Sequence, residues 1–272
     1  MHGKTDCPPL PGIMVAPNGA RRTQADHPAV PITIGETVAA AKACFEAGAG
    51  ALHAHVRDAD GIHVLDAGLY RELLSEMKTA VPGMLVQVTT EAVGRYSPQE
   101  QRSLVRSVEP EAVSIALREM VPDEDTAEAA AFYGWMRDRN CAVQHILYSP
   151  EDLDRLVDLA GAGVVPGTGH QILFVLGRYT AGQQSVPADL EPFLQKLEER
   201  RGSLMLDWAV CAFGHRETDC LVDAVRKGGK ARIGFENNFR NRDGRVAEDN
   251  AARVRDLVAA LEAENLMTGR SA

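Results

Sequence analysis

The segment 36–56, "ETVAAAKACFEAGAGALHAHV", contains an amphipathic stretch, a glycine-rich stop and an apolar run, in that order. Residues 36–47 have helical spacing, and the glycines of "EAGAG" are typical of a helix end. Residues 50–56 form a short, nearly continuous apolar run, as expected of a strand that is covered on both faces. The segment therefore predicts a helix followed by a buried parallel strand.

This unit recurs along the whole chain. Ser97-Pro98 and Ser149-Pro150 each place a serine and a proline where helices favour them, at the N-cap and in the first turn. The predicted strands are 13–16, 50–56, 84–89, 112–117, 141–147, 171–176, 204–211 and 231–235. The predicted helices are 36–47, 67–80, 98–107, 125–139, 150–161, 187–200, 215–227 and 248–264.

Eight strands alternating with eight helices over 272 residues predict a closed (β/α)8 barrel, the TIM barrel. We expect one domain over residues 1–272, with a short irregular segment at about 1–12. An open doubly wound sheet is the alternative, and it would be expected to carry a glycine-rich nucleotide loop after its first strand. The sequence there, "APNGARR" at 16–22, is not such a loop.

The composition of the chain limits the classes of partner that we expect it to bind. The chain is 45% hydrophobic and 25% charged, with a formal net charge of −9. It has no block of lysine and arginine, which argues against nucleic acid as a partner. No apolar run has the length of a membrane span. The start, "MHGKTDCPPLPG", lacks the apolar core of a signal peptide, and the five cysteines form no CxxC pair. We therefore expect a cytoplasmic protein.

Two histidines at the end of the second predicted strand indicate a metal site. His53 and His55 are two residues apart, so both imidazoles lie on the same side of the strand. A single buried histidine is more often a hydrogen-bonded core residue, but a pair at a strand end favours metal. Glu236 ends the eighth strand, which only the first strand separates from the second in a closed barrel. A His-His-Glu set fits zinc, and manganese, cobalt or iron would also fit.

Further polar residues lie at strand ends, where barrel enzymes place their active sites. They predict a polar funnel above the metal. No lysine occupies such a position, which argues against a Schiff-base aldolase, and the serine-nucleophile motif GxSxG is absent. The funnel residues are Thr89, Thr90, Glu91, Ser114, Arg118, Glu119, Gln144, His145, Arg232 and Asn237.

At these residues the sequence resembles the β-keto acid cleavage enzymes, typified by the 3-keto-5-aminohexanoate cleavage enzyme. The resemblance covers nearly the whole chain. It is carried by "GARRTQADHPAVPIT", "KACFEAGAGALHAHVRDADG", "QVTT", "HQILFVLG" and "RIGFENN", with "DGRVAEDNAARV" leading into the last helix.

The resemblance implies a zinc-dependent homotetramer that converts a β-keto acid and acetyl-CoA into acetoacetate and a new acyl-CoA. His53, His55 and Glu236 match the zinc ligands of the family. Arg232 matches an arginine that orients an aspartate acting in proton transfer. Thr89 and Ser114 match small hydroxyl residues that contact the substrate or the tetrahedral adduct.

Three positions depart from the family pattern. Asn237 stands in place of the proton-transferring aspartate, and an amide cannot act as a general base. Arg21 replaces an acidic residue that reads a substrate ammonium group, and Gln144 replaces a glutamate. The pocket thereby loses negative charge, so we predict a substrate side chain that is neutral or anionic rather than cationic, with Arg118 as a second cationic contact.

Two alternatives stay open. A metal-dependent hydrolase can also use an HxH motif in a barrel, but places it after the first strand rather than the second. A metal- and ligand-binding barrel without catalysis would account for Asn237. The intact ligand set argues against such a decayed site, because buried polar groups are costly to keep without a use.

Overall fold

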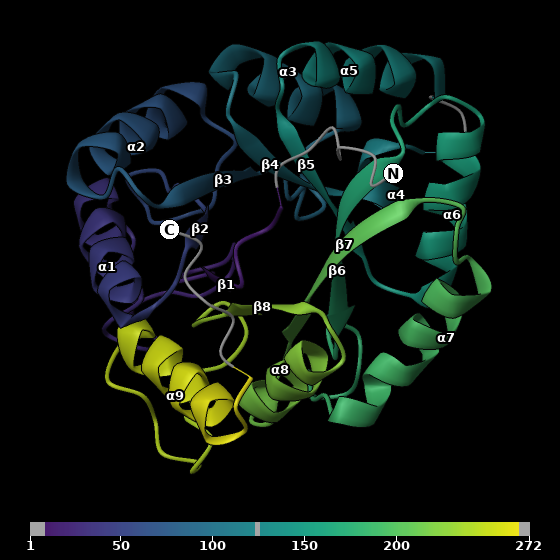
Figure 1. Cartoon of the computed structure of the whole chain (residues 1–272). Coiled ribbons are helices and arrows are strands. Elements are labelled where there is room, and N and C mark those ends of the chain that lie inside the picture. The colour runs from purple at the N-terminus through teal and green to yellow at the C-terminus, as the bar shows by residue number, and fades with distance from the viewer. Residues whose placement is uncertain (1–8, 123–125, 267–272) are drawn as a thin grey trace.

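A computed structural model describes residues 9–122 and 126–266 of the chain. Eight parallel strands follow one another around a closed barrel, and the last strand pairs with the first (Figure 1). The predicted TIM barrel is therefore confirmed. The strands are β1 (Ile13–Val15), β2 (Ala51–Ala54), β3 (Leu85–Thr89), β4 (Ala112–Ala116), β5 (Ala142–Leu147), β6 (Gly169–Leu176), β7 (Met205–Ala212) and β8 (Lys230–Ile233).

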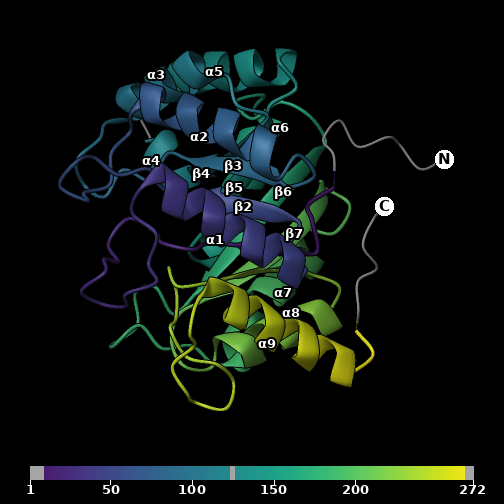
Figure 2. The same ribbon diagram turned by 90° about the vertical axis from the view of Figure 1, so that its left-hand side faces the viewer.

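Helices surround the strands, and α1 lies against α9 where the two ends of the fold meet (Figures 1 and 2). One short helix that the sequence does not predict directly extends β4, and a 3-10 turn begins the predicted helix 187–200. The helices are α1 (Ile34–Ala47), α2 (Ala67–Ala80), α3 (Pro98–Val108), α4 (Leu117–Met120), α5 (Thr126–Asp138), α6 (Pro150–Gly161), η1 (Pro187–Leu190), α7 (Glu191–Glu199), α8 (Glu217–Arg226) and α9 (Asn250–Ala263).

Local sequence fixes several helix ends. The hydroxyl of Ser97 accepts a hydrogen bond from the backbone N–H of Glu100, and the Glu100 carboxylate accepts one from the N–H of Ser97. Gly48 ends α1 in the left-handed region with φ = 118°. The next residues lead at once into β2, so this cap sets where the histidine strand begins.

An apolar plug fills the middle of the barrel. It consists of Leu10, Ala116, Ile146, Leu173, Val175, Ala209, Cys211 and Phe213. Below it, at the end where the strands begin, Lys230 pairs with Asp207 at 2.7 Å. Above it, the loops after the strands gather at the opposite end, on the left in Figure 2. Four members of the plug, Ala116, Ile146, Val175 and Phe213, line the cavity at that end.

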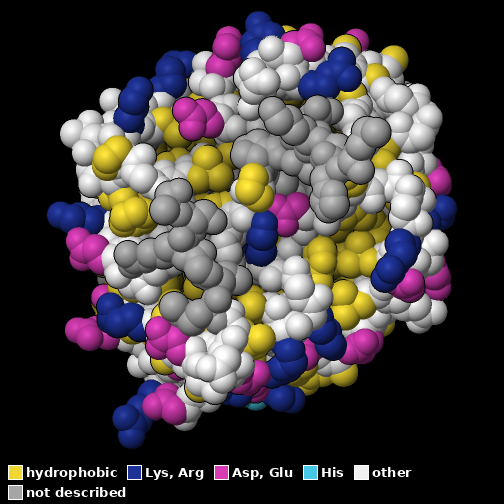
Figure 3. Space-filling model, viewed as in Figure 1, with side chains coloured by type: hydrophobic (Ala, Val, Ile, Leu, Met, Phe, Trp, Pro, Cys, Tyr) yellow, Lys and Arg dark blue, Asp and Glu magenta, His cyan; other side chains and the backbone are white. Residues whose placement is uncertain are grey.

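The face at the beginning of the strands carries no extended patch of one charge in Figure 3, because positive and negative side chains alternate over it. No helix of the described chain has the length and apolar character needed to cross a membrane. This face thus agrees with the absence of a basic block in the sequence.

Candidate active site

His53, on β2, is held by a chain of amides inside the barrel. Its Nδ1 atom lies 2.9 Å from Oε1 of Gln87, and Nε2 of Gln87 donates to Oε1 of Gln144 at 3.0 Å. Because Oε1 of Gln87 can only accept, Nδ1 of His53 carries the proton. Its Nε2 atom therefore keeps a free lone pair, directed at His55.

Glu236 reaches the histidines because two glycines let the ends of β1 and β8 approach each other. A Cβ atom at Gly19 would lie 2.6 Å from Cγ of Glu236. A Cβ atom at Gly234, where φ is +146°, would lie 2.3 Å from the carbonyl oxygen of Ala16. The backbone N–H of Glu236 then donates to that same carbonyl at 3.1 Å. Any side chain at these glycines would displace the carboxylate.

The three predicted ligands converge as a metal would require. Nε2 of His53 is 3.2 Å from Nε2 of His55, and Oε2 of Glu236 is 3.7 and 3.9 Å from them. Ligand atoms about 2.1 Å from one zinc ion lie roughly 3.4 Å apart. Among the described residues, this is the one group of three histidine, cysteine or acidic side chains whose ligand atoms lie mutually within 4.8 Å.

The electrostatics of the group also fit a cation. Oε2 of Glu236 is buried and has no hydrogen-bond partner in the described chain. Burial, followed by the charge of Arg232, holds the pKa of His53 well below its ordinary value, and burial does the same to the pKa of His55. Both imidazoles are therefore neutral, which is the form that binds metal.

Arg57 organises the loop after β1. Its guanidinium donates to the carbonyls of Ala20 and Arg22 at 3.0 and 3.1 Å, and it also contacts the carbonyl of Gly19. The side chain of Asn18 donates to the carbonyl of His55 at 2.9 Å. Arg57 thus acts on the site through the loop that follows β1.

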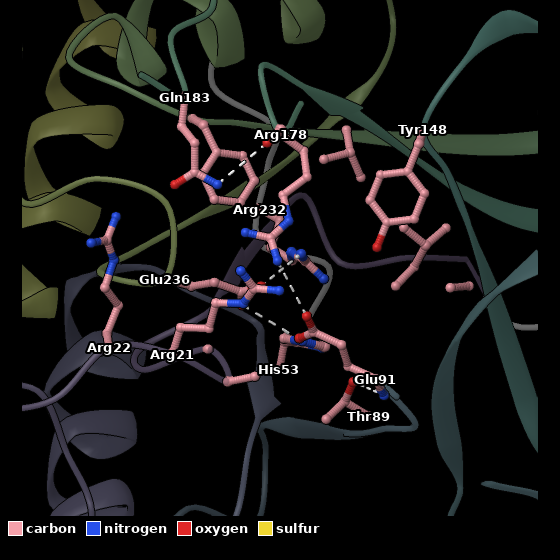
Figure 4. A pocket seen from close by; sticks show the side chains of 16 residues that line it. Arg21, Arg22, His53, Thr89, Glu91, Tyr148, Arg178, Gln183, Arg232 and Glu236 are labelled. Carbon is pink, nitrogen blue, oxygen red and sulfur yellow. Dashed lines mark hydrogen bonds and ion pairs between the residues drawn. The ribbon is translucent and has the colours of Figure 1, made fainter. Parts of the chain in front are cut away.

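A cavity of about 220 Å³ lies beside His53 and Glu236. Figure 4 shows Arg21, Arg178 and Arg232 directed into it, together with Glu91 and Glu236. Of the residues predicted from the sequence, it is lined by Arg21, His53, Thr89, Arg232 and Glu236. A second cavity shares Arg21, Glu91, Tyr148, Arg178 and Gln183 with it, and a third, of about 540 Å³, shares Arg22 and Gln183.

The sequence had pointed to Glu91 only as one of several polar strand-end residues, and it had not pointed to Arg178 at all. Oε1 of Glu91 lies 3.5 Å from Nη2 of Arg178, and Oε2 lies 3.8 Å from Nε2 of His55. Burial, followed by the charge of Glu236, raises the pKa of Glu91 to about 7. The position of Glu91 directly after "QVTT" was the available signal, whereas Arg178 lies in a loop that carries no pattern.

Two predicted substrate contacts do not line the cavity. Gln144 is bound to Gln87 one layer below it. Arg118 lies on α4, where it pairs with Asp152 at 2.6 Å and lies over the ring of Tyr148. Neither side chain therefore lines the cavity, because the first lies deeper in the barrel and the second is held by Asp152 on the short helix.

Three further predicted residues are also absent from the lining of the first cavity. The hydroxyl of Thr90 donates to the carbonyl of Ser114 at 3.1 Å, so it ties β3 to β4. Oγ of Ser114 is buried without a hydrogen-bond partner in the described chain. Both amide atoms of Asn237 are likewise buried and unpartnered, and this residue lines the third cavity instead.

Comparison with known proteins finds a family model that matches nearly the whole chain. The family model of the beta-keto acid cleavage enzyme matches residues 12–268. The chain belongs to this family. The resemblance found in the sequence is therefore confirmed, and the site lies on a chain whose family cleaves β-keto acids.

Individual relatives agree with the family. The chain is 29% identical to the 3-oxoadipate:acetyl-CoA acetyltransferase of Cupriavidus necator, over 92% of this chain and 88% of that protein. It is 27% identical to the 3-keto-5-aminohexanoate cleavage enzyme of Fusobacterium nucleatum, over 90% and 89%. These names support β-keto acid cleavage with acetyl-CoA as co-substrate.

Among solved structures, the chain is similar in fold to the ternary complex of ObcA with a C4-CoA adduct and oxalate. The TM-score is 0.70 at 17% identity, over 88% of this chain and 65% of the ObcA chain. This similarity supports the barrel and nothing finer.

Proposed function

We propose that the protein is a metal-dependent β-keto acid cleavage enzyme. It converts R–CO–CH₂–COO⁻ and acetyl-CoA into acetoacetate and R–CO–CoA, so that the acyl group R–CO moves to the sulfur of CoA. The observation that carries this proposal is the convergence of two neutral imidazoles and the unpartnered Oε2 of Glu236 under a cavity, in a chain of this family.

The metal would be held by His53, His55 and Glu236, with zinc as the first expectation and other divalent transition metals as alternatives. When bound, such an ion polarises a substrate oxygen and stabilises the negative charge that develops on it. Two further cavities share lining residues with the one beside these ligands, and we place acetyl-CoA in this joined space.

Two residues of the chain are suited to hold the substrate at the ion. Oγ1 of Thr89 accepts a hydrogen bond from the N–H of Glu91 at 3.2 Å, so its own proton is free to be donated into the cavity. Nε and Nη1 of Arg232 are buried and unpartnered in the described chain. These donors are preorganised for a carboxylate or for an oxygen that gains charge.

The substrate side chain is proposed to be anionic or neutral. Four arginines line the cavity against two glutamates. Arg232 lies beside Glu236 and Arg178 beside Glu91, whereas no ion pair of Arg21 is found in the described part of the chain. A carboxylate on the substrate would supply that partner. The relative named for 3-oxoadipate, a dicarboxylate, supports the same direction.

The Glu236→Gln variant tests the metal assignment. An amide is a poor ligand for zinc, so metal content and cleavage activity should fall together. Glu262→Gln, on the exposed face of α9, is the control and should keep both. Full metal content in Glu236→Gln would show that the third ligand is wrong.

The homotetramer and the cytoplasmic location stay predictions from the sequence. Light scattering of the purified protein measures the first, and localisation of a tagged chain measures the second.

A further inference from the structure

Glu91 stands at the metal site in nearly the same relation to His55 as Glu236 does. Oε2 of Glu91 is 3.8 Å from Nε2 of His55, and Oε2 of Glu236 is 3.9 Å from the same atom. Figure 4 shows the Glu91 side chain inside the cavity, on the side of His53 and Arg178. The imidazole of His55 is therefore approached by two carboxylates.

The position of Glu91 is fixed on three sides. Its backbone N–H donates to Oγ1 of Thr89, and its carbonyl lies 3.1 Å from Nε2 of His63. Its other carboxylate oxygen lies 3.5 Å from Arg178, and the two side chains are only 18% and 16% exposed. These contacts hold the backbone of Glu91 in place and keep its carboxylate beside the histidines.

Two largely buried carboxylates beside neutral imidazoles repel each other, and a cation between them removes the repulsion. We infer that Glu91 is a fourth protein ligand of the divalent cation, an inference that rests on the metal-dependent function proposed above. Because Glu91 stands outside the group that lies mutually within 4.8 Å, its carboxylate must turn toward the ion on binding.

A fourth ligand changes which ions the site prefers. Two imidazoles, two carboxylates and two substrate oxygens would offer six donor atoms, four of them oxygen, rather than the four of a tetrahedral site. Oxygen-rich sites of this kind suit manganese better than a His-His-Glu site does. Glu91 therefore contributes more to the affinity for Mn²⁺ than to the affinity for Zn²⁺.

The test measures metal binding to the full chain after chelator treatment. Mn²⁺ and Zn²⁺ are titrated into the wild type, Glu91→Gln and Glu119→Gln by calorimetry, and the visible spectrum of each protein is recorded with Co²⁺. Glu119 is the matched control because it is an acid near the same loop whose carboxylate accepts the Ala92 N–H at 3.1 Å, a bond that glutamine can also make.

We expect Glu91→Gln to weaken Mn²⁺ binding roughly tenfold to a hundredfold, to weaken Zn²⁺ binding less, and to change the Co²⁺ spectrum. Glu119→Gln should stay within about threefold of the wild type, with an unchanged spectrum. Thermal melts of the metal-free proteins confirm that both variants are folded. Glu91→Asp, which keeps the charge but shortens the reach, should also change the spectrum.

Two results would overturn the inference while leaving the proposed function standing. One is unchanged affinity in Glu91→Gln. The other is weaker affinity with an unchanged Co²⁺ spectrum, which would show that Glu91 acts only through its charge. Failure of the wild type to bind any of the three ions would instead overturn the metal-dependent function itself.

Discussion

Nη2 of Arg232 lies 3.4 Å from Oε1 of Glu236, across the turn that ends β8. The arginine engages one carboxylate oxygen, so the other oxygen is left to face His53 and His55. The sequence separation of four residues and the strand-end turn create this pairing. Arg232 is thus a positioning residue for the metal ligand as well as a candidate contact for the substrate.

Arg232→Lys should weaken both zinc binding and turnover. Lysine keeps the charge but lacks the planar fork that can engage Glu236 while presenting further donors. Losing a group that orients a metal ligand costs roughly tenfold to a hundredfold in metal affinity. Chelator competition measures the affinity, with Arg245→Lys at an exposed site as control. If activity falls while zinc affinity is unchanged, Arg232 acts on the substrate alone.

Arg21→Ala should change the preference among substrates rather than abolish cleavage activity. A hydrogen bond to a charged group is worth about 1.5–3 kcal/mol, so kcat/KM for a β-keto dicarboxylate should fall roughly tenfold to a hundredfold. The kcat/KM for a β-keto acid with a neutral side chain should change little. Equal losses for both substrates would argue against a charge-reading role, and a wild-type preference for an amino keto acid would contradict the predicted polarity of the pocket.

Gly234→Ala should destabilise the fold and disturb Glu236. The new Cβ would lie 2.3 Å from the carbonyl oxygen of Ala16, at a residue whose φ is +146°. Backbone strain and overpacking together predict a loss of about 3 kcal/mol or more in the free energy of unfolding. Gly94→Ala is the matched control, because φ there is +74° and no atom lies within 4 Å of the added Cβ. Denaturant unfolding should show a clearly smaller loss for Gly94→Ala.

The free energy of unfolding of His145→Phe should fall less than that of the wild type as the pH is lowered from 7 to 5. Burial, followed by the charge of His170, lowers the pKa of His145 from 6.5 to about 3. A histidine with a depressed folded-state pKa contributes stability that is present above pH 6.5 and is lost as the pH falls toward 3. From pH 7 to pH 5 this amounts to about 2 kcal/mol.

Unfolding free energies measured at pH 7 and pH 5 give the comparison. The difference between the two pH values should be smaller in His145→Phe than in the wild type, and unchanged in His215→Phe, where the histidine is exposed. Equal pH dependence in all three proteins would show that His145 is not kept neutral by burial.

Much of this arrangement follows from sequence pattern. Alternating apolar runs and helical stretches predict the barrel, and barrel closure predicts that Glu236 meets His53 and His55, although they are far apart in the chain. Strand periodicity also predicts which residues point inward. It does not predict their height along the barrel axis, which is why Gln144 was expected at the cavity and instead supports Gln87.

Other positions depend on tertiary contacts that no local pattern encodes. Arg118 was expected at the mouth of β4, but the added helix α4 gives it Asp152 as a partner. The pairing of Glu91 with Arg178 joins two loops that are far apart in the sequence. Sequence pattern therefore predicts the convergence of His53, His55 and Glu236 better than the loop residues that line the cavity around them.

The most direct test of the proposed function is one assay of metal-loaded protein with a β-keto dicarboxylate, run with and without acetyl-CoA and read by mass spectrometry. We predict that acetoacetate and the new acyl-CoA appear in equal amounts, only when acetyl-CoA is present. Consumption of the keto acid without acetyl-CoA would indicate a hydrolase. No turnover across a panel of dicarboxylate, neutral and amino β-keto acids would indicate a barrel that binds its ligands without converting them.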